Sequence, residues 1–194
     1  MFGHRMHGDK LSGLTRDEIL QGLEKVNAYL AGKNVQGEIC IYDEACLCLA
    51  FAGRVSTKDV DAVFEPAAII RKAAFEVAHE MGWNWNWLND DVKGFVSETG
   101  ESAKNVMTLP EFSNLKVYTA APEYLLAMKC LAAREGDEEE PSTDLADTAM
   151  LCRELKISTS DEIERVISKF YRDTDIPERT GFFIAEVLNQ LNKA

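Results

Sequence analysis

Two short runs of β-forming residues are each followed by a segment with helical spacing. The runs are GEICIY (37–42) and DVDAVF (59–64), and the segments after them are EACLCLAFAG (44–53) and AAIIRKAAFEVAHEMG (67–82). Pro66 ends the second run, because proline cannot continue a strand ladder. The order strand, helix, strand, helix predicts a sheet with helices packed on it.

Further elements are expected on both sides of this unit. Residues 14–33 open with a capping box of Thr15 and Glu18 and carry apolar residues at helical spacing, so they predict a helix. NVMTL (105–109) and LKVYTA (115–120) read as strands, and WNWNWLNDDVKGF (83–95) reads as a loop with one short helix. After Pro122 the pattern predicts four helical segments, at 122–134, 142–155, 160–172 and 177–194.

These elements predict an α+β fold with a mixed sheet flanked by helices and a C-terminal helical appendage. The expected boundaries are 1–120 for an N-terminal helix plus an α/β core, and 121–194 for a helical region packed on that core. With 46% hydrophobic residues, the chain can bury a core of this size.

Composition excludes several classes of protein. The net charge of −12 opposes strong non-specific binding to DNA, which depends on lysine and arginine. No apolar run is long enough for a membrane span and no signal peptide is visible, so we expect a soluble cytoplasmic protein without membrane partners. The five cysteines, which show no zinc-site spacing, are predicted to be buried free thiols.

Asp59 and Asp61 are the first candidate site. In a strand their side chains share one face, while Val60, Ala62 and Phe64 point to the other face and into the core. Two adjacent carboxylates repel unless a cation or donors satisfy them, and such hard oxygen ligands suit Mg²⁺. Magnesium bound in this way serves phosphoryl and nucleotidyl transfer. An Asp-x-Asp motif also occurs by chance in an aspartate-rich chain, so it does not specify this chemistry alone.

The surrounding sequence resembles a known family. Strand, turn and helix followed by R-x-x-T-K-D-V-D resembles the nucleotidyltransferase superfamily with its polymerase-beta-like fold, and more narrowly the small bacterial branch of AbiEii-type toxins and related uncharacterised proteins. Residues 125–155 and WLNDDVKGF are similar to further segments of that branch. The residues at matching positions are Arg54, Thr57, Asp59, Asp61, Lys129, Arg134, Asp144 and Asp147.

The resemblance implies an enzyme that transfers a nucleoside monophosphate from a nucleoside triphosphate to a hydroxyl of RNA, protein or a small molecule. It implies Mg²⁺ or Mn²⁺ as cofactor, tRNA or a protein as acceptor, and an antitoxin as partner. It assigns Asp59 and Asp61 to metal binding and catalysis, and Lys129 with Asp144 or Asp147 to catalysis. Lys129 alone reads equally as a surface lysine, and Asp144 as a residue favoured by a helix dipole.

One position departs from the family pattern, in which a glycine pair precedes the first helix of the core. Here Asp43 and Glu44 stand in those places, and with Arg54 and Thr57 they are the candidate nucleotide-binding residues. Asp43 also reads as a helix N-cap and Glu44 as a first-turn acid. Three alternatives follow: the nucleotide is held differently, Asp43 adds a cation ligand, or the chain is a catalytically impaired relative that binds a nucleotide or a protein.

Overall fold

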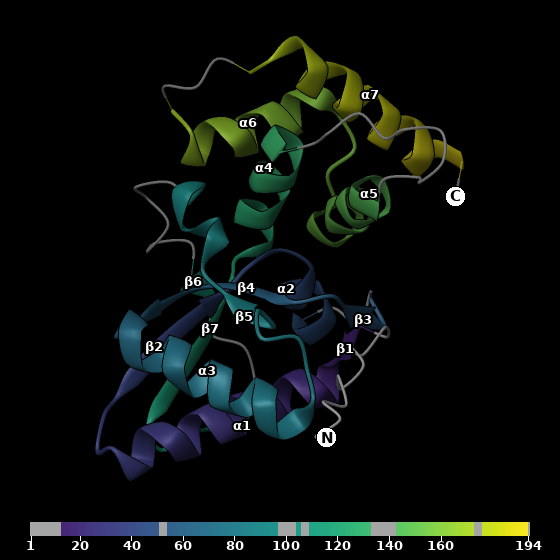
Figure 1. The fold of residues 1–194 in the computed structure, drawn as a ribbon. Helices are drawn as coiled ribbons and strands as arrows, with labels where there is room; N and C mark the ends of the chain where they lie inside the picture. The colour runs from purple at the N-terminus through teal and green to yellow at the C-terminus, as the bar shows by residue number, and fades with distance from the viewer. Residues whose placement is uncertain are drawn as a thin grey trace, which may run out of the picture. The chain divides into compact units, whose positions relative to one another are not determined.

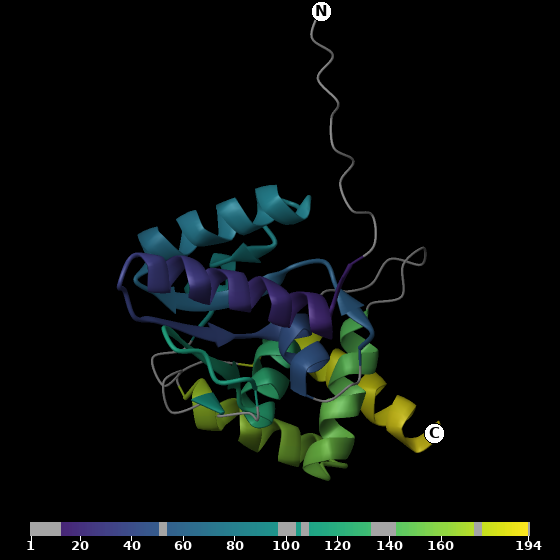
Figure 2. The same ribbon diagram turned by 90° about the horizontal axis from the view of Figure 1, so that it is seen from below.

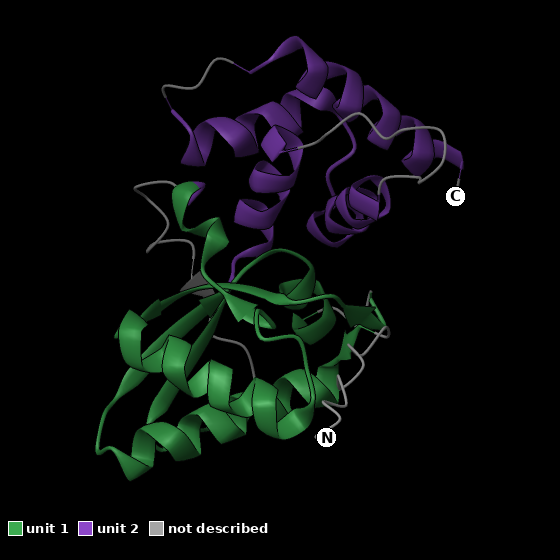
Figure 3. Cartoon of the chain, viewed as in Figure 1, with its two compact units in different colours: residues 1–94, 106–119 green, residues 95–105, 120–194 purple. Residues whose placement is uncertain are grey.

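The computed structural model describes residues 13–50, 54–96, 104–105, 109–132, 143–172 and 176–193 (Figure 1). The chain forms two compact units, residues 1–94 with 106–119 (unit 1) and residues 95–105 with 120–194 (unit 2) (Figure 3). Within the described ranges, no helix combines the length and the apolar character needed to cross a membrane.

Unit 1 is built on a mixed sheet. Four strands lie in the order β5-β4-β2-β7, with β2 antiparallel to β4 and parallel to β7, and β4 parallel to β5. A separate antiparallel pair joins β1 to β3. The elements are β1 (Leu14–Thr15), α1 (Arg16–Gly32), β2 (Gly37–Ile41), α2 (Asp43–Ala50), β3 (Ser56–Thr57), β4 (Val60–Glu65), α3 (Ala67–Met81), β5 (Leu88–Asn89), the 3-10 helix η1 (Asp91–Gly94) and β7 (Leu115–Ala120). The predicted α+β class with a mixed sheet is confirmed.

One face of β2 and β4 forms the core beneath α1 and α3. Ile39 lies opposite Phe64 and Ile41 opposite Ala62 across the two strands, and all four side chains are buried. The helices α1 and α3 lie side by side in both ribbon views (Figures 1 and 2). A Cβ atom at Gly37 would lie 2.8 Å from Cδ1 of Leu30 in α1 and 3.2 Å from Cδ1 of Ile70 in α3, so both helices pack closely over this strand.

Trp87 closes the end of this core. Its side chain is fully buried, and its indole Nε1 donates a hydrogen bond to the Ala74 carbonyl at 2.9 Å. The ring of Trp83 meets it edge to face, with centroids 5.2 Å apart. Gly22 of α1 lies against both rings, where a Cβ atom would come within 2.6 Å of the Trp87 ring. Trp87 is therefore a core residue, whereas the nearby Trp85 side chain is 70% exposed.

Most predicted elements of unit 1 are confirmed, but the short strands β1 and β3 were not predicted. The helix α1 starts with the predicted capping box, in which Thr15 and Glu18 satisfy each other's backbone N–H groups. The segment 83–95 contains the short helix η1, but it also contains β5, which the loop prediction missed. The predicted strand 105–109 overlaps β6 (Lys104–Asn105) at one residue, and residues 106–108 lie outside the described ranges.

Unit 2 is predominantly helical, as predicted. Its helices are α4 (Pro122–Ala132), α5 (Thr143–Leu155), α6 (Ser160–Phe170) and α7 (Glu178–Lys193). α4 packs against the other three, and Tyr124 of α4 meets Phe170 of α6 edge to face at 5.1 Å. The five cysteines of the chain are buried, as their apolar surroundings predicted.

Candidate functional site

Asp59 and Asp61 lie where β4 begins, beside the end of β2. The backbone N–H of Tyr42, the residue after β2, donates to the carbonyl of Asp61 at 2.9 Å. Val60, Ala62 and Phe64 are buried in the core, so the alternation of the strand directs Asp61 to the opposite face. Asp59 directly precedes β4 and, like Asp61, is half-buried. The predicted sidedness of this strand is confirmed.

Asn89 of β5 joins the two aspartates. It stands beside Asp61 in the parallel register of β4 and β5, so the two side chains share a face. The Nδ2 group of Asn89 lies 3.4 Å from Oδ2 of Asp59, and the Asn89 side chain, as a hydrogen-bond donor beside Asp61, opposes the rise in the pKa of Asp61. Asn89 is 5% exposed, and its Oδ1 accepts a hydrogen bond from the backbone N–H of Asp91 at 3.0 Å.

Burial and nearby negative charges disfavour ionisation of both Asp59 and Asp61. Burial, followed by the charges of Asp59 and Asp43, raises the pKa of Asp61 to about 6. The pKa of Asp59 is also raised, first by burial and then by Asp43 and Asp91, against a smaller opposing effect of Lys58. Four aspartates from β4 and its surroundings therefore act on one another, which favours binding of a cation.

Asp43 holds an unusual backbone conformation. Its φ angle of 46° lies in the left-handed region, which glycine adopts freely and other residues adopt at a cost. The Tyr42 carbonyl accepts the hydrogen bond from Cys46 N–H at 3.2 Å, so the hydrogen-bond ladder of α2 begins at Tyr42, which occupies the N-cap place. The prediction of Asp43 as N-cap is therefore wrong by one residue, because the strand ends directly in the helical ladder.

The remaining candidates for nucleotide binding contact one another. Arg54 forms an ion pair with Glu44 Oε2, and these side chains are 15% and 29% exposed. The Thr57 hydroxyl lies 3.3 Å from the same Glu44 oxygen and 3.0 Å from the carbonyl of Asp59. Arg54 and Thr57 thus both bind the carboxylate of Glu44, the first-turn acid of α2.

The donor set fits a hard divalent cation only in part. Among the residues that the structure describes, no three histidine, cysteine, aspartate or glutamate side chains converge as a preformed metal centre. Mg²⁺ is, however, commonly held by one or two carboxylates together with water and substrate phosphates, rather than by a cage of protein ligands. Asp59 and Asp61 supply two such carboxylates, and their oxygen chemistry fits Mg²⁺ or Mn²⁺.

A second group of predicted residues lies in unit 2. Lys129 of α4 is 5% exposed, and its Nζ lies 3.0 Å from Asp144 Oδ1 and 3.2 Å from Asp147 Oδ2. Asp144 and Asp147 stand three residues apart on α5, and therefore on one face of that helix. The reading of Lys129 as a surface lysine is wrong, because both carboxylates hold it in a buried position. Arg134 lies outside the described residues.

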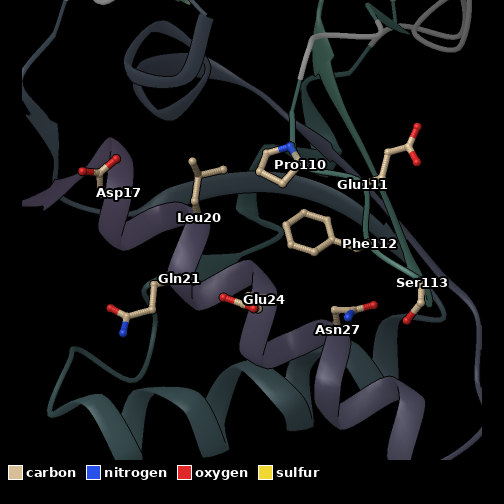
Figure 4. A pocket seen from close by; sticks show the side chains of 9 residues that line it. All are labelled: Asp17, Leu20, Gln21, Glu24, Asn27, Pro110, Glu111, Phe112 and Ser113. Carbon is tan, nitrogen blue, oxygen red and sulfur yellow. The ribbon is translucent and has the colours of Figure 1, made fainter.

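A separate hollow lies against α1 (Figure 4). It measures about 530 Å³ and is lined by α1 and by residues 110–113, with Phe112, Leu20 and Pro110 as its apolar side chains. Asp17, Glu24 and Glu111 add carboxylates to its rim (Figure 4). None of the predicted site residues is among the nine described residues that line it.

The sequence did not single out Asn89 or Asp91 as parts of the site. The motif WLNDDVKGF was noted for its resemblance to the branch, but no role followed from it. Comparison of the chain with protein-family models, curated proteins and solved structures finds no match in any of the three.

Proposed function

We propose that the chain is a Mg²⁺- or Mn²⁺-dependent nucleotidyltransferase that transfers a nucleoside monophosphate to a hydroxyl of RNA, a protein or a small molecule. The observation that carries the proposal is the Asp59–Asp61 pair, two half-buried carboxylates on one face of the sheet with raised pKa values. Perturbed carboxylates of this kind are typical of functional sites.

Three aspartates of unit 1 have roles in this proposal. Asp59 and Asp61 bind the divalent cation, and the negative charge that disfavours their ionisation is then compensated. The bound cation supplies charge neutralisation at the phosphate oxygens of the nucleotide. Asp43 approaches the same region from the start of α2 and increases the negative charge that a cation meets.

The ion pair of Glu44 with Arg54 favours a second candidate function. Arg54 and Thr57, which the resemblance assigns to the nucleotide, already bind a carboxylate of the chain itself. A phosphate group would compete with Glu44 for these donors. The second candidate is therefore a catalytically impaired relative that acts as a nucleotide- or protein-binding module, with an antitoxin as one such partner.

One experiment separates the two candidates. The wild-type chain is incubated with each labelled nucleoside triphosphate, Mg²⁺ or Mn²⁺, and either tRNA or cell extract. The double variant Asp59→Asn/Asp61→Asn keeps the shape of both side chains but removes their charge. Label transfer by the wild type and its loss in the variant support the enzyme. Calorimetry showing no nucleotide binding, and binding restored in Asp43→Gly/Glu44→Gly, indicates an impaired nucleotide site and supports the protein-binding form of the second candidate.

The roles of Lys129 and Asp144 have a test of their own. Asp144→Asn removes one of the two carboxylates that hold Lys129, while Asp147 still binds its Nζ. The fold of unit 2 is therefore expected to persist in this variant. Loss of label transfer by a folded Asp144→Asn chain would assign Asp144 to catalysis, and full activity would restrict it to a structural role.

A further inference from the structure

The neighbours of Asn89 determine which end of its side-chain amide is the oxygen and which is the nitrogen. An asparagine amide offers two N–H donors and one carbonyl acceptor. The backbone N–H of Asp91 points to one end of this amide at 3.0 Å, and a backbone N–H can only donate. That end is therefore the oxygen, and Nδ2 faces Oδ2 of Asp59 at 3.4 Å, while Asp61 stands beside Asn89 in the strand register.

The fixed amide lies in the interior of unit 1. Asn89 is 5% exposed, and its strand β5 is tied to β4 by the hydrogen bond from Val60 N–H to the Trp87 carbonyl at 2.7 Å. Trp87, two residues before Asn89, is fully buried. A buried side chain between a packed tryptophan and a bonded backbone amide has little freedom to rotate.

We propose that Asn89 is a positioning residue, which orients the carboxylate of Asp59 beside Asp61 so that both aspartates can bind one divalent cation. The inference rests on the proposed function and extends it to a residue that does not itself bind the cation. The N–H that Asn89 directs to Oδ2 of Asp59 leaves Oδ1 of that carboxylate for the metal, and Asp61 stands beside the same amide. Groups that hydrogen-bond metal ligands in this way are worth about 10- to 100-fold in metal affinity.

The test measures Mn²⁺ binding rather than activity. Isothermal titration calorimetry gives the Kd of the wild-type chain and of Asn89→Leu, which has a similar size but no donors. Asn89→Ser, a smaller residue that cannot overpack the site, serves if the leucine variant does not fold. The matched control is Asn27→Leu, because Asn27 also bonds a backbone N–H, that of Asn114 at 2.8 Å, at a different place in unit 1. Thermal melts without metal report the stability of each variant.

We expect the Kd for Mn²⁺ to rise about 10-fold or more in both Asn89 variants, and to stay within about twofold of wild type in Asn27→Leu. Two results overturn the inference alone: an unchanged Kd in the Asn89 variants, or an equal loss of affinity in Asn27→Leu, which would indicate general destabilisation. A wild-type chain without saturable Mn²⁺ binding overturns the proposed function, and the inference with it. The wild-type titration thus separates the two failures.

Discussion

Replacement of Asp61 by asparagine should stabilise the metal-free protein at neutral pH. In the folded chain the pKa of Asp61 is raised from 3.8 to about 6, so the folded state holds the proton more tightly than the unfolded state. Stability is therefore lost as the pH rises from about 4 to about 6, and the whole penalty is present above that window. The groups that face Asp61 are Asp59, Asp43, Asp91 and the donor Asn89, and three of these four add negative charge.

The size of the effect follows from the pKa difference. A change from 3.8 to about 6 corresponds to about 3 kcal/mol, at about 1.36 kcal/mol for each pKa unit. Because Asp61 is only half-buried, solvent screening reduces this value, and we expect a gain of about 1 to 2 kcal/mol. For a chain of this length, that gain raises Tm by about 2 to 8 °C.

The assay is a series of thermal melts of wild type and Asp61→Asn in a metal chelator, from pH 4 to pH 8. The difference in Tm should grow between pH 4 and pH 6 and then stay constant. Asp90→Asn is the control, and it should lower Tm at neutral pH instead of raising it. The reason is that the Arg71 guanidinium holds the pKa of Asp90 below its usual value. An Asp61→Asn variant that is no more stable than wild type at pH 7.5 would refute the reasoning.

Three further predictions concern the folded scaffold. Asp43→Ala should be about 1 kcal/mol less stable than Asp43→Gly in chemical denaturation, because both remove the same charge and only glycine relieves the φ angle of 46°. Lys129→Met should cost about 3 kcal/mol by leaving two carboxylates without their shared cation, and replacing both carboxylates by asparagine in that variant should recover much of the loss. Gly22→Ala should cost about 1 to 3 kcal/mol and change tryptophan fluorescence, since its Cβ would meet the Trp87 ring at 2.6 Å.

The face of β4 could be predicted because its pattern is local. Val60, Ala62 and Phe64 alternate with polar or less buried residues, and alternation alone decides which side faces the core. The helices were predictable for the same reason, because the capping box at Thr15 and the apolar spacing lie within one segment. These features need no knowledge of which segments meet in the fold.

The partnership of Asn89 with the aspartates could not be predicted in this way. Asn89 and Asp59 are 30 residues apart in the chain, and they meet only because β5 pairs with β4. A strand of two residues is too short to show an alternating pattern. The burial of Lys129 was equally hidden, since the spacing of Asp144 and Asp147 places both acids on one helix face but does not name the cation between them.

Asp43 links the backbone and the charge of the candidate site. Its left-handed φ and the raised pKa values of Asp59 and Asp61 are separate costs to folding, and Asp43 takes part in both. Glycine at this position would remove the strain and one of the repelling charges together, so stability alone does not account for an aspartate here. Strain and perturbed carboxylates that coincide at one place are typical of sites kept for function. The stability of Asp43→Gly, measured with and without Mn²⁺ and compared with wild type, therefore tests whether Asp43 contributes to cation binding.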